Sequence, residues 1–199
     1  MGLETYIILY GGGGINEDPN YTPEERHDVR DNFKNAALTR ADEIRNYSNF
    51  NPNDDAIIIK ETKYVSDFVS AINSPYGSGP IQEITTFTHA YSAAGSQTSA
   101  GLNLGGGIVG EGKLRWFESP NVNELDPNFA EDAIFNLYGC NTANNNAGSS
   151  IAQWIADKFP NVSVFGYLGN SNFIWPEANK TYLVPTYKNK GKIQVFPRK

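Results

Sequence analysis

The amino-acid sequence predicts an α/β fold with a doubly wound, mainly parallel β-sheet that helices flank on both faces. Short apolar runs rich in β-branched residues alternate with segments whose apolar residues recur at helical spacing. The first run, TYIILY, is too brief for a helix and stops at four glycines. Helical crossovers make successive strands parallel and cover both faces of the sheet, so this alternation indicates the fold class.

Five strands and three long helices are expected. The strands cover residues 5–10, 56–60, 81–88, 133–138 and 162–168, and the helices cover 23–47, 65–72 and 151–159. The longest helix has a clear start, because Thr22 is a good N-cap, Pro23 suits the first helical position and Glu25 completes a capping box. The tail, residues 182–196, is expected to form a C-terminal hairpin that turns at Lys190-Gly191.

The stretch from residue 90 to residue 129 interrupts the alternation. It is rich in glycine, serine and asparagine, which predicts long surface loops with a hairpin around residues 113–117. Its glycine-rich part, residues 95–112, is expected to form a mobile rim over a cleft, since glycine lowers the cost of disorder.

Composition bounds the function. A chain of 199 residues, 39% of them hydrophobic, suits a single domain over residues 1–199. No apolar run approaches the ~18 residues that span a membrane. A net charge of −6 without a basic cluster argues against nucleic acid as a partner. One cysteine excludes an internal disulfide and, with two histidines, supplies a zinc site poorly, so no metal or cofactor is expected.

The N-terminus indicates where the protein works. Met1-Gly2-Leu3-Glu4 lacks the basic start and the long apolar run of a secretory signal, so we expect a cytoplasmic protein. The chain could equally be one domain of a longer protein, or an effector exported without a cleaved signal.

Two rare residues follow predicted strands directly. His89 comes after the third strand, and Cys140 comes after the fourth, preceded by Gly139. Ligands of open parallel sheets bind beyond the carboxyl ends of the strands. If these strands are neighbours, the two side chains leave the same edge about 5 Å apart, and the imidazole can deprotonate the thiol. Taken singly, the cysteine could be inert core and the histidine structural.

The segments ITTFTHAYSAAG and AIFNLYGCNTANN resemble the caspase, gingipain and legumain group of cysteine peptidases. There, a strand ends in histidine, and another strand ends in cysteine about fifty residues later. The following GSSIAQWIADKFPNVSVFGYLG is also similar to the helix and strand after the cysteine in those folds, so the resemblance spans residues 5–170.

The resemblance implies a caspase-like sheet, Cys140 as nucleophile and His89 as general base or acid. It also implies that the backbone N–H groups of Cys140 and Ala90 hold the oxyanion. The group usually has glycine after the histidine, whereas this chain has Ala90, whose methyl group could crowd the substrate carbonyl. The small residue before the cysteine is present as Gly139.

The resemblance also suggests a pocket for the side chain before the scissile bond, walled by residues 166–179 and 11–21. These segments hold no lysine or arginine, but they contain the acids Glu17, Asp18 and Glu177 and the aromatic residues Tyr167 and Trp175. A substrate aspartate would need a cationic partner, so a basic or neutral side chain fits better. Alternatively, the acids simply face solvent.

The sequence also contains two other motif-like segments. Ala90-Tyr91-Ser92-Ala93-Ala94 loosely resembles a serine-hydrolase elbow, but no histidine follows it in the chain. The glycines 11–14 fail the dinucleotide-binding spacing at Asn16, and no phosphate-binding lysine follows them. They are better explained by a tight strand exit where other backbone approaches closely.

The sequence therefore predicts a cysteine-dependent hydrolase, most concretely a peptidase that acts on a peptide or protein substrate through an acyl-enzyme on Cys140, assisted by His89. The alternative is a catalytically degenerate caspase-like domain that serves as an interaction module. An effector or toxin domain is compatible with either function.

Overall fold

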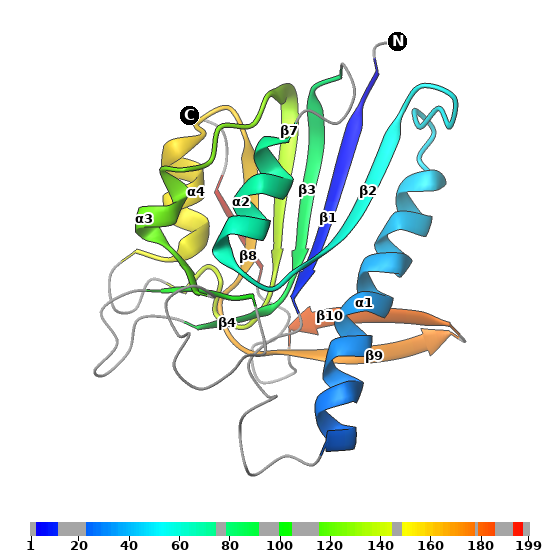
Figure 1. The fold of residues 1–199 in the computed structure, drawn as a ribbon, viewed down its shortest axis with the longest axis vertical. Helices are drawn as coiled ribbons and strands as arrows, with labels where there is room; N and C mark the ends of the chain where they lie inside the picture. Colours follow the sequence, from blue (N-terminus) through cyan, green and yellow to red (C-terminus); the bar gives the residue numbers. More distant parts are fainter. Residues whose placement is uncertain are drawn as a thin grey trace.

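The computed structural model describes residues 3–11, 23–74, 79–91, 100–104, 116–144, 149–177, 179–185 and 193–196. Figure 1 shows one main sheet with helices around it and a hairpin that runs across the lower ends of its strands. The main sheet contains β1 (Thr5–Gly11), β2 (Ala56–Thr62), β3 (Ile81–Phe87), β7 (Phe129–Tyr138), β8 (Ser163–Tyr167) and β11 (Ile193–Phe196). The helices are α1 (Pro23–Arg45), α2 (Val65–Asn73), α3 (Ser119–Val122) and α4 (Ile151–Lys158).

The order of strands in the main sheet is β11-β8-β7-β3-β1-β2. The strands β1, β2, β3, β7 and β8 pair in parallel with their neighbours in the sheet. The last strand, β11, pairs antiparallel with β8 and forms one edge. The predicted doubly wound, mainly parallel sheet is confirmed, and so are the five predicted strands. The predicted helices are confirmed as α1, α2 and α4.

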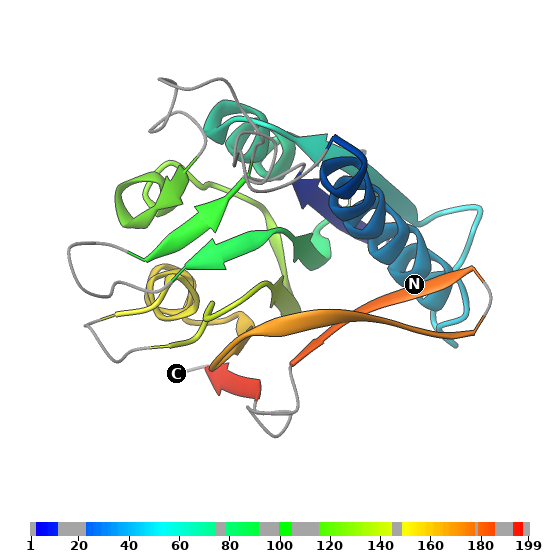
Figure 2. The ribbon, with the colours of Figure 1, turned by 90° about the horizontal axis from the view of Figure 1, so that it is seen from below.

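Alternation along the central strand sends side chains into two separate cores. Ile7 and Leu9 of β1 pack with α2 and α4, whereas Tyr6 and Ile8 pack with α1. The view from below shows α2 and α4 on one side of the sheet and α1 with the hairpin on the other (Figure 2). Strands buried on both faces read as continuous apolar runs, which is why TYIILY could be recognised as a strand.

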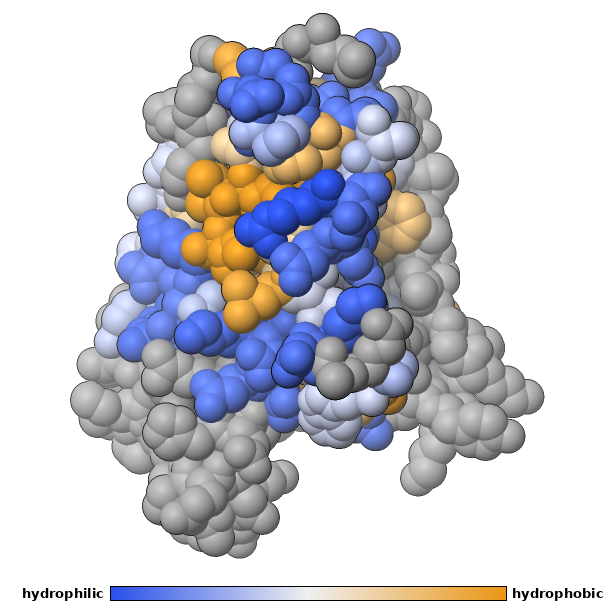
Figure 3. All heavy atoms as spheres, turned by 90° about the vertical axis from the view of Figure 1, so that its right-hand side faces the viewer, coloured by the Kyte–Doolittle hydropathy of each residue, from blue (hydrophilic) through white to orange (hydrophobic). Residues whose placement is uncertain are grey.

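β2 forms one edge of the sheet. Its residues from Ala56 to Glu61 are half-buried, and Figure 3 shows apolar side chains gathered on this side of the molecule with polar ones lying across them. Three isoleucines precede Lys60 and Glu61 in this strand. Charged residues on an edge strand discourage pairing with other chains.

The predicted C-terminal hairpin is present but is made by other residues than expected. β9 (Ser171–Glu177) and β10 (Lys180–Pro185) pair antiparallel, with Leu183 opposite Phe173. The expected pairing within residues 182–196 is wrong, because β10 joins β9 while β11 joins β8. The expected turn at Lys190-Gly191 lies outside the described residues.

The prediction of surface loops from residue 90 to residue 129 holds for residues 123–128 but is wrong for most of the other described residues of this stretch. β4 (His89–Tyr91), β5 (Gly101–Asn103) and β6 (Trp116–Glu118) form a small antiparallel sheet. Leu102 and Leu104 are buried in the core, and the Phe117 ring lies 4.6 Å from that of Phe68. Short strands of three residues escape a periodicity test. The remainder of the expected rim, residues 95–99 and 105–112, lies outside the described residues.

Gly11 has the role expected of a tight strand exit. A Cβ atom there would lie 2.7 Å from the backbone oxygen of Leu104, so the strand can leave the sheet at this point only without a side chain. Within the described residues, no helix has both the length and the apolar character needed to cross a membrane.

Candidate active site

His89 and Cys140 leave the same edge of the sheet. β3 and β7 are adjacent and parallel, with Phe87 opposite Tyr138, and the Thr88 N–H donates to the Tyr138 carbonyl oxygen over 3.1 Å. His89 directly follows Thr88, and Cys140 lies two residues after Tyr138. The predicted adjacency of the two strands is therefore confirmed.

The contacts of Gly139 show how closely the chain after β7 approaches the chain after β3. A Cβ atom on Gly139 would lie 2.6 Å from the Thr88 carbonyl oxygen and 3.1 Å from the Cβ of Ala90. The residues on both sides of His89 thus lie against the residue that precedes Cys140. Glycine is required here because the contact is with backbone, which cannot swing aside as a side chain can.

Gly139→Ala is expected to lower the free energy of unfolding by about 1–3 kcal/mol, the usual cost of overpacking. The added methyl group must push the Thr88 backbone away, and the ends of β3 and β7 move apart. Urea unfolding followed by circular dichroism measures the change. An unchanged midpoint would show that the strand ends are not held in this contact.

The thiol of Cys140 lies beside the first residue of β9. The Ser171 N–H donates to Sγ over 3.4 Å, and the Ser171 hydroxyl lies 3.5 Å from Sγ. The Ser171 carbonyl oxygen is 3.9 Å away, within range for the S–H group as donor. Cys140 itself is half-buried. These contacts fix the direction of the side chain and offer a donor to a thiolate.

The loop after the cysteine is tied to both neighbouring strands. Asn141 adopts a φ of 59°, and its N–H donates to the Gly169 carbonyl oxygen over 2.8 Å. The Thr142 hydroxyl donates to the Leu137 carbonyl oxygen and accepts from the Tyr167 N–H. A left-handed asparagine allows the sharp turn, and the buried threonine holds the loop to β7 and β8.

His89 is packed in surroundings that disfavour a charged imidazole. Its ring meets the Phe33 ring of α1 edge-on, with centroids 5.1 Å apart and planes at 90°. Burial lowers the pKa of His89 from its ordinary value, because desolvation disfavours the charged form. Its Nε2 atom is buried and has no hydrogen-bond partner among the described residues. An unpaired buried nitrogen of this kind costs stability.

β9 links the surroundings of the two candidate catalytic side chains. Ser171 lies at the Cys140 thiol, and Phe173 contacts the same Phe33 ring that packs on His89, with centroids 5.2 Å apart. Residues two apart on a strand point to the same side and are roughly 7 Å apart. Both candidate residues therefore lie on the side of the sheet that carries α1 and the hairpin.

The methyl group of Ala90 lies away from this side. Ala90 packs against the core that contains α2 and α4, and its Cβ is directed at Gly139. Side chains alternate along an extended segment, so the methyl group and the His89 ring point to opposite faces. The sequence suggested that this methyl group could crowd a substrate carbonyl, and the packing directs it to the core that contains α2 and α4.

The predicted substrate-binding residues are scattered. Tyr167 is buried, and its hydroxyl donates to the Leu183 carbonyl oxygen over 2.6 Å. Trp175 on β9 is 60% exposed, and its ring lies 6.5 Å from that of Phe173. Glu17 and Asp18 lie outside the described residues, and Glu177 ends β9. The described residues contain no group of three or more histidine, cysteine or acidic side chains that could hold a metal ion.

Sequence reasoning missed Ser171 and Phe33. Ser171 lies 31 residues beyond Cys140 in the chain and follows a glycine-asparagine pair, which carries no signal for a thiol contact. Phe33 belongs to the core residues of α1, and its spacing in the sequence does not indicate that its ring meets His89. Both roles depend on tertiary packing.

Comparison with known proteins gives one solved structure and no family. No protein family matches the sequence, and no curated protein matches it significantly. The chain is similar in structure to a secreted C11 cysteine protease from Bacteroides thetaiotaomicron, solved with an irreversible peptide inhibitor. The TM-score is 0.44 and the sequence identity is 10%, over 85% of this chain and 50% of the protease. This chain thus spans about half the length of that protease.

Proposed function

We propose that this protein is a cysteine peptidase in which Cys140 is the nucleophile and His89 is the general base and acid. The observation that carries the proposal is the contact of Gly139 with both neighbours of His89 at the carboxyl ends of β3 and β7. Two residues able to form a catalytic pair therefore leave one edge of the sheet side by side.

The chemistry needs only these two side chains and backbone N–H groups. As the Cys140 sulfur attacks the carbonyl carbon, its proton moves to the neutral imidazole of His89. The C–N bond then breaks and the departing amine takes that proton, which leaves a thioester on Cys140. Water cleaves the thioester and restores the thiol. The N–H groups of Cys140 and Ala90 are proposed as donors to the oxyanion.

A hydrogen bond between His89 and the thiol would form when substrate orders the site. The unpartnered Nε2 of His89 is free to take part in it, and catalytic hydrogen bonds are often incomplete without substrate. The lowered pKa of His89 keeps the imidazole unprotonated, and hence able to accept a proton, at neutral pH.

The rate of alkylation by iodoacetamide tests the pair. Cys140 is the single cysteine, so incorporation measured by mass spectrometry reports on it alone. We expect His89→Phe, which retains a ring against Phe33, to lower the rate at pH 7 about tenfold or more, because less thiolate forms. His27→Phe removes the other histidine and should leave the rate unchanged.

Equal rates in the wild type and His89→Phe would contradict the pair. A slow reaction that is independent of His89 would instead support the non-catalytic interaction module. The folded state of each variant is checked by circular dichroism before labelling.

A further inference from the structure

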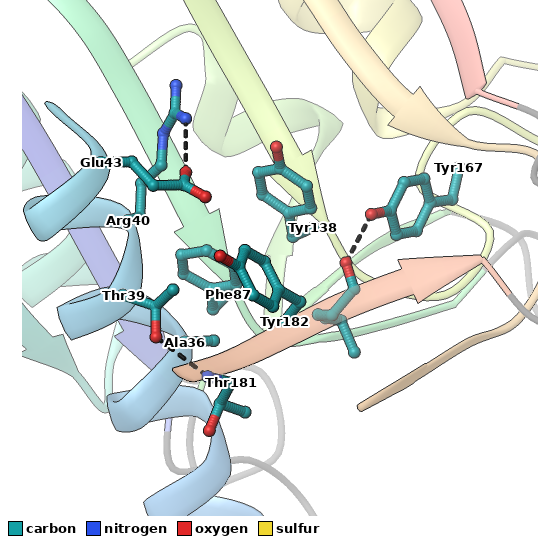
Figure 4. A pocket seen from close by; sticks show the side chains of 10 residues that line it. Ala36, Thr39, Arg40, Glu43, Phe87, Tyr138, Tyr167, Thr181 and Tyr182 are labelled. Atoms are coloured by element: carbon teal, nitrogen blue, oxygen red, sulfur yellow. Dashed lines mark hydrogen bonds and ion pairs between the residues drawn. The ribbon is translucent and has the colours of Figure 1, made fainter. Parts of the chain in front are cut away.

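A pocket lies next to the candidate catalytic pair, beside the strand residues that precede His89 and Cys140 in the sequence. Its volume is about 260 Å³, and it is bounded by α1, by the ends of β3, β7 and β8, and by β10 (Figure 4). Its floor includes Phe87 and Tyr138, each two residues before His89 or Cys140 and on the same face of the sheet. The remaining lining residues are Ala36, Thr39, Arg40, Glu43, Tyr167, Thr181, Tyr182 and Leu183.

Two points hold β10 in place as a wall of this pocket. The Thr181 N–H donates to the Thr39 hydroxyl of α1 over 3.0 Å, and the Tyr167 hydroxyl donates to the Leu183 carbonyl oxygen (Figure 4). Thr39, Thr181 and Leu183 are buried. The pocket lies between these two attachments, so its walls are preformed.

Four of the ten lining residues are aromatic. The rings of Phe87 and Tyr138 are stacked, with centroids 4.9 Å apart and planes at 11°. Tyr167 stands at 80° to Tyr138 at 5.7 Å, and Tyr182 projects from β10 (Figure 4). The π-face of a tyrosine attracts a cation.

The charges around the pocket favour a cation and disfavour an anion. Arg40 binds Glu83 through Nε at 2.9 Å and Nη2 at 2.8 Å, and its Nη1 binds Glu43 at 2.8 Å. Arg40 and Glu43 line the pocket and the buried Glu83 does not, and the three groups together carry a formal charge of −1. An anion would either compete with Glu43 for the guanidinium or bring a third negative charge to the cluster. The Glu43 side chain is 37% exposed and lies at the pocket wall, where it can attract a cation.

We propose that this pocket binds a small organic monocation, an ammonium group on a short apolar body. Its volume is below the roughly 300–1,000 Å³ of pockets for drug-sized molecules, so the ligand is smaller than those. The tyrosine and phenylalanine rings contact the apolar body and the cation, and Glu43 balances the charge. The proposal does not depend on the proposed peptidase activity.

A pair of isosteres tests the charge requirement. Choline and its neutral analogue 3,3-dimethylbutan-1-ol share one shape and differ in carrying N⁺ or carbon at the centre. Calorimetric titration of the full chain is expected to show choline binding at least tenfold more tightly, which corresponds to about 1.4 kcal/mol. Equal affinity for both compounds, or no binding of choline, would overturn the proposal.

Matched variants on α1 locate the site. Glu43→Gln should weaken choline binding about threefold or more, whereas Asp42→Asn makes the same change in net charge one residue away and should not. Asp42 pairs with Arg45 and is absent from the pocket lining. An equal loss in both variants would indicate only a general effect of charge. Cys140→Ala should bind choline as the wild type does, which separates this test from that of the peptidase.

Discussion

Glu83→Gln is expected to lower the free energy of unfolding by about 3–5 kcal/mol, the cost of removing the buried carboxylate from an ion pair. Glu83 is 3% exposed and binds Arg40 through both carboxylate oxygens. The Thr85 hydroxyl also donates to it over 2.5 Å, and Asn136 donates in turn to Thr85. Burial alone would lower the pKa of Arg40, but the hydrogen bond and charge of Glu83, with Glu43, hold it above its ordinary value.

Two further variants separate the buried pair from the exposed one. Glu43→Gln also removes a partner of Arg40, but at a partly exposed position, so a loss of less than about 1 kcal/mol is expected. The double variant Arg40→Leu/Glu83→Leu removes both charges and should be more stable than Glu83→Gln. Urea unfolding of all variants gives the comparison. A Glu83→Gln protein as stable as Glu43→Gln would show that water reaches the pair freely.

Cys140→Ala is expected to abolish hydrolysis of peptides while leaving the fold intact. The thiol is the proposed site of the covalent intermediate, and Cys140 is half-buried at a strand end rather than in either core. His89→Phe should lower kcat/KM on the order of 10²-fold or more, as loss of a general base does. The measurement is a panel of fluorogenic peptides that differ only in the residue before the scissile bond, with arginine, lysine, alanine, leucine or aspartate.

The pH dependence of the same assay identifies the base. Burial lowers the pKa of His89 below the ordinary histidine pKa of 6.5. The imidazole therefore becomes protonated only when the pH falls below 6.5. The acid limb of kcat/KM should therefore fall below pH 6.5 and disappear in His89→Phe. Full hydrolysis by Cys140→Ala would refute the nucleophile, and clear selection of aspartate would contradict the predicted basic or neutral preference.

The strands and helices were predictable because each carries a local signal. β1 and β3 are buried on both faces, which forces short continuous apolar runs, and the sequence of α1 carries a capping pattern at its start and apolar residues at helical spacing. The positions of His89 and Cys140 followed from the same rule, since each stands just beyond a recognisable strand. Their adjacency needed only the assumption that β3 and β7 are neighbours, which the sheet confirms.

The missed features depend on contacts distant in sequence. β10 pairs with β9 rather than with β11, because Leu183 and Tyr182 pack toward α1 and the pocket. No local pattern chooses between two possible partners for a short strand. Arg40 and Glu83 lie 43 residues apart and each appears in the sequence as an ordinary charged residue. Only the fold reveals them as a buried pair.

The hairpin also sets the order in which the site can assemble. The hydrogen bond from Thr181 to Thr39 joins residues 142 positions apart in the chain. The contact of Ser171 with Cys140 joins residues 31 positions apart. Closing long loops costs entropy before their contacts stabilise anything, so β9 and β10 dock late in folding. During synthesis, β1, β2 and β3 emerge before Cys140 and well before Ser171. The thiol is therefore made before the segment that holds it, and a growing chain carries an unsupported cysteine until the hairpin docks.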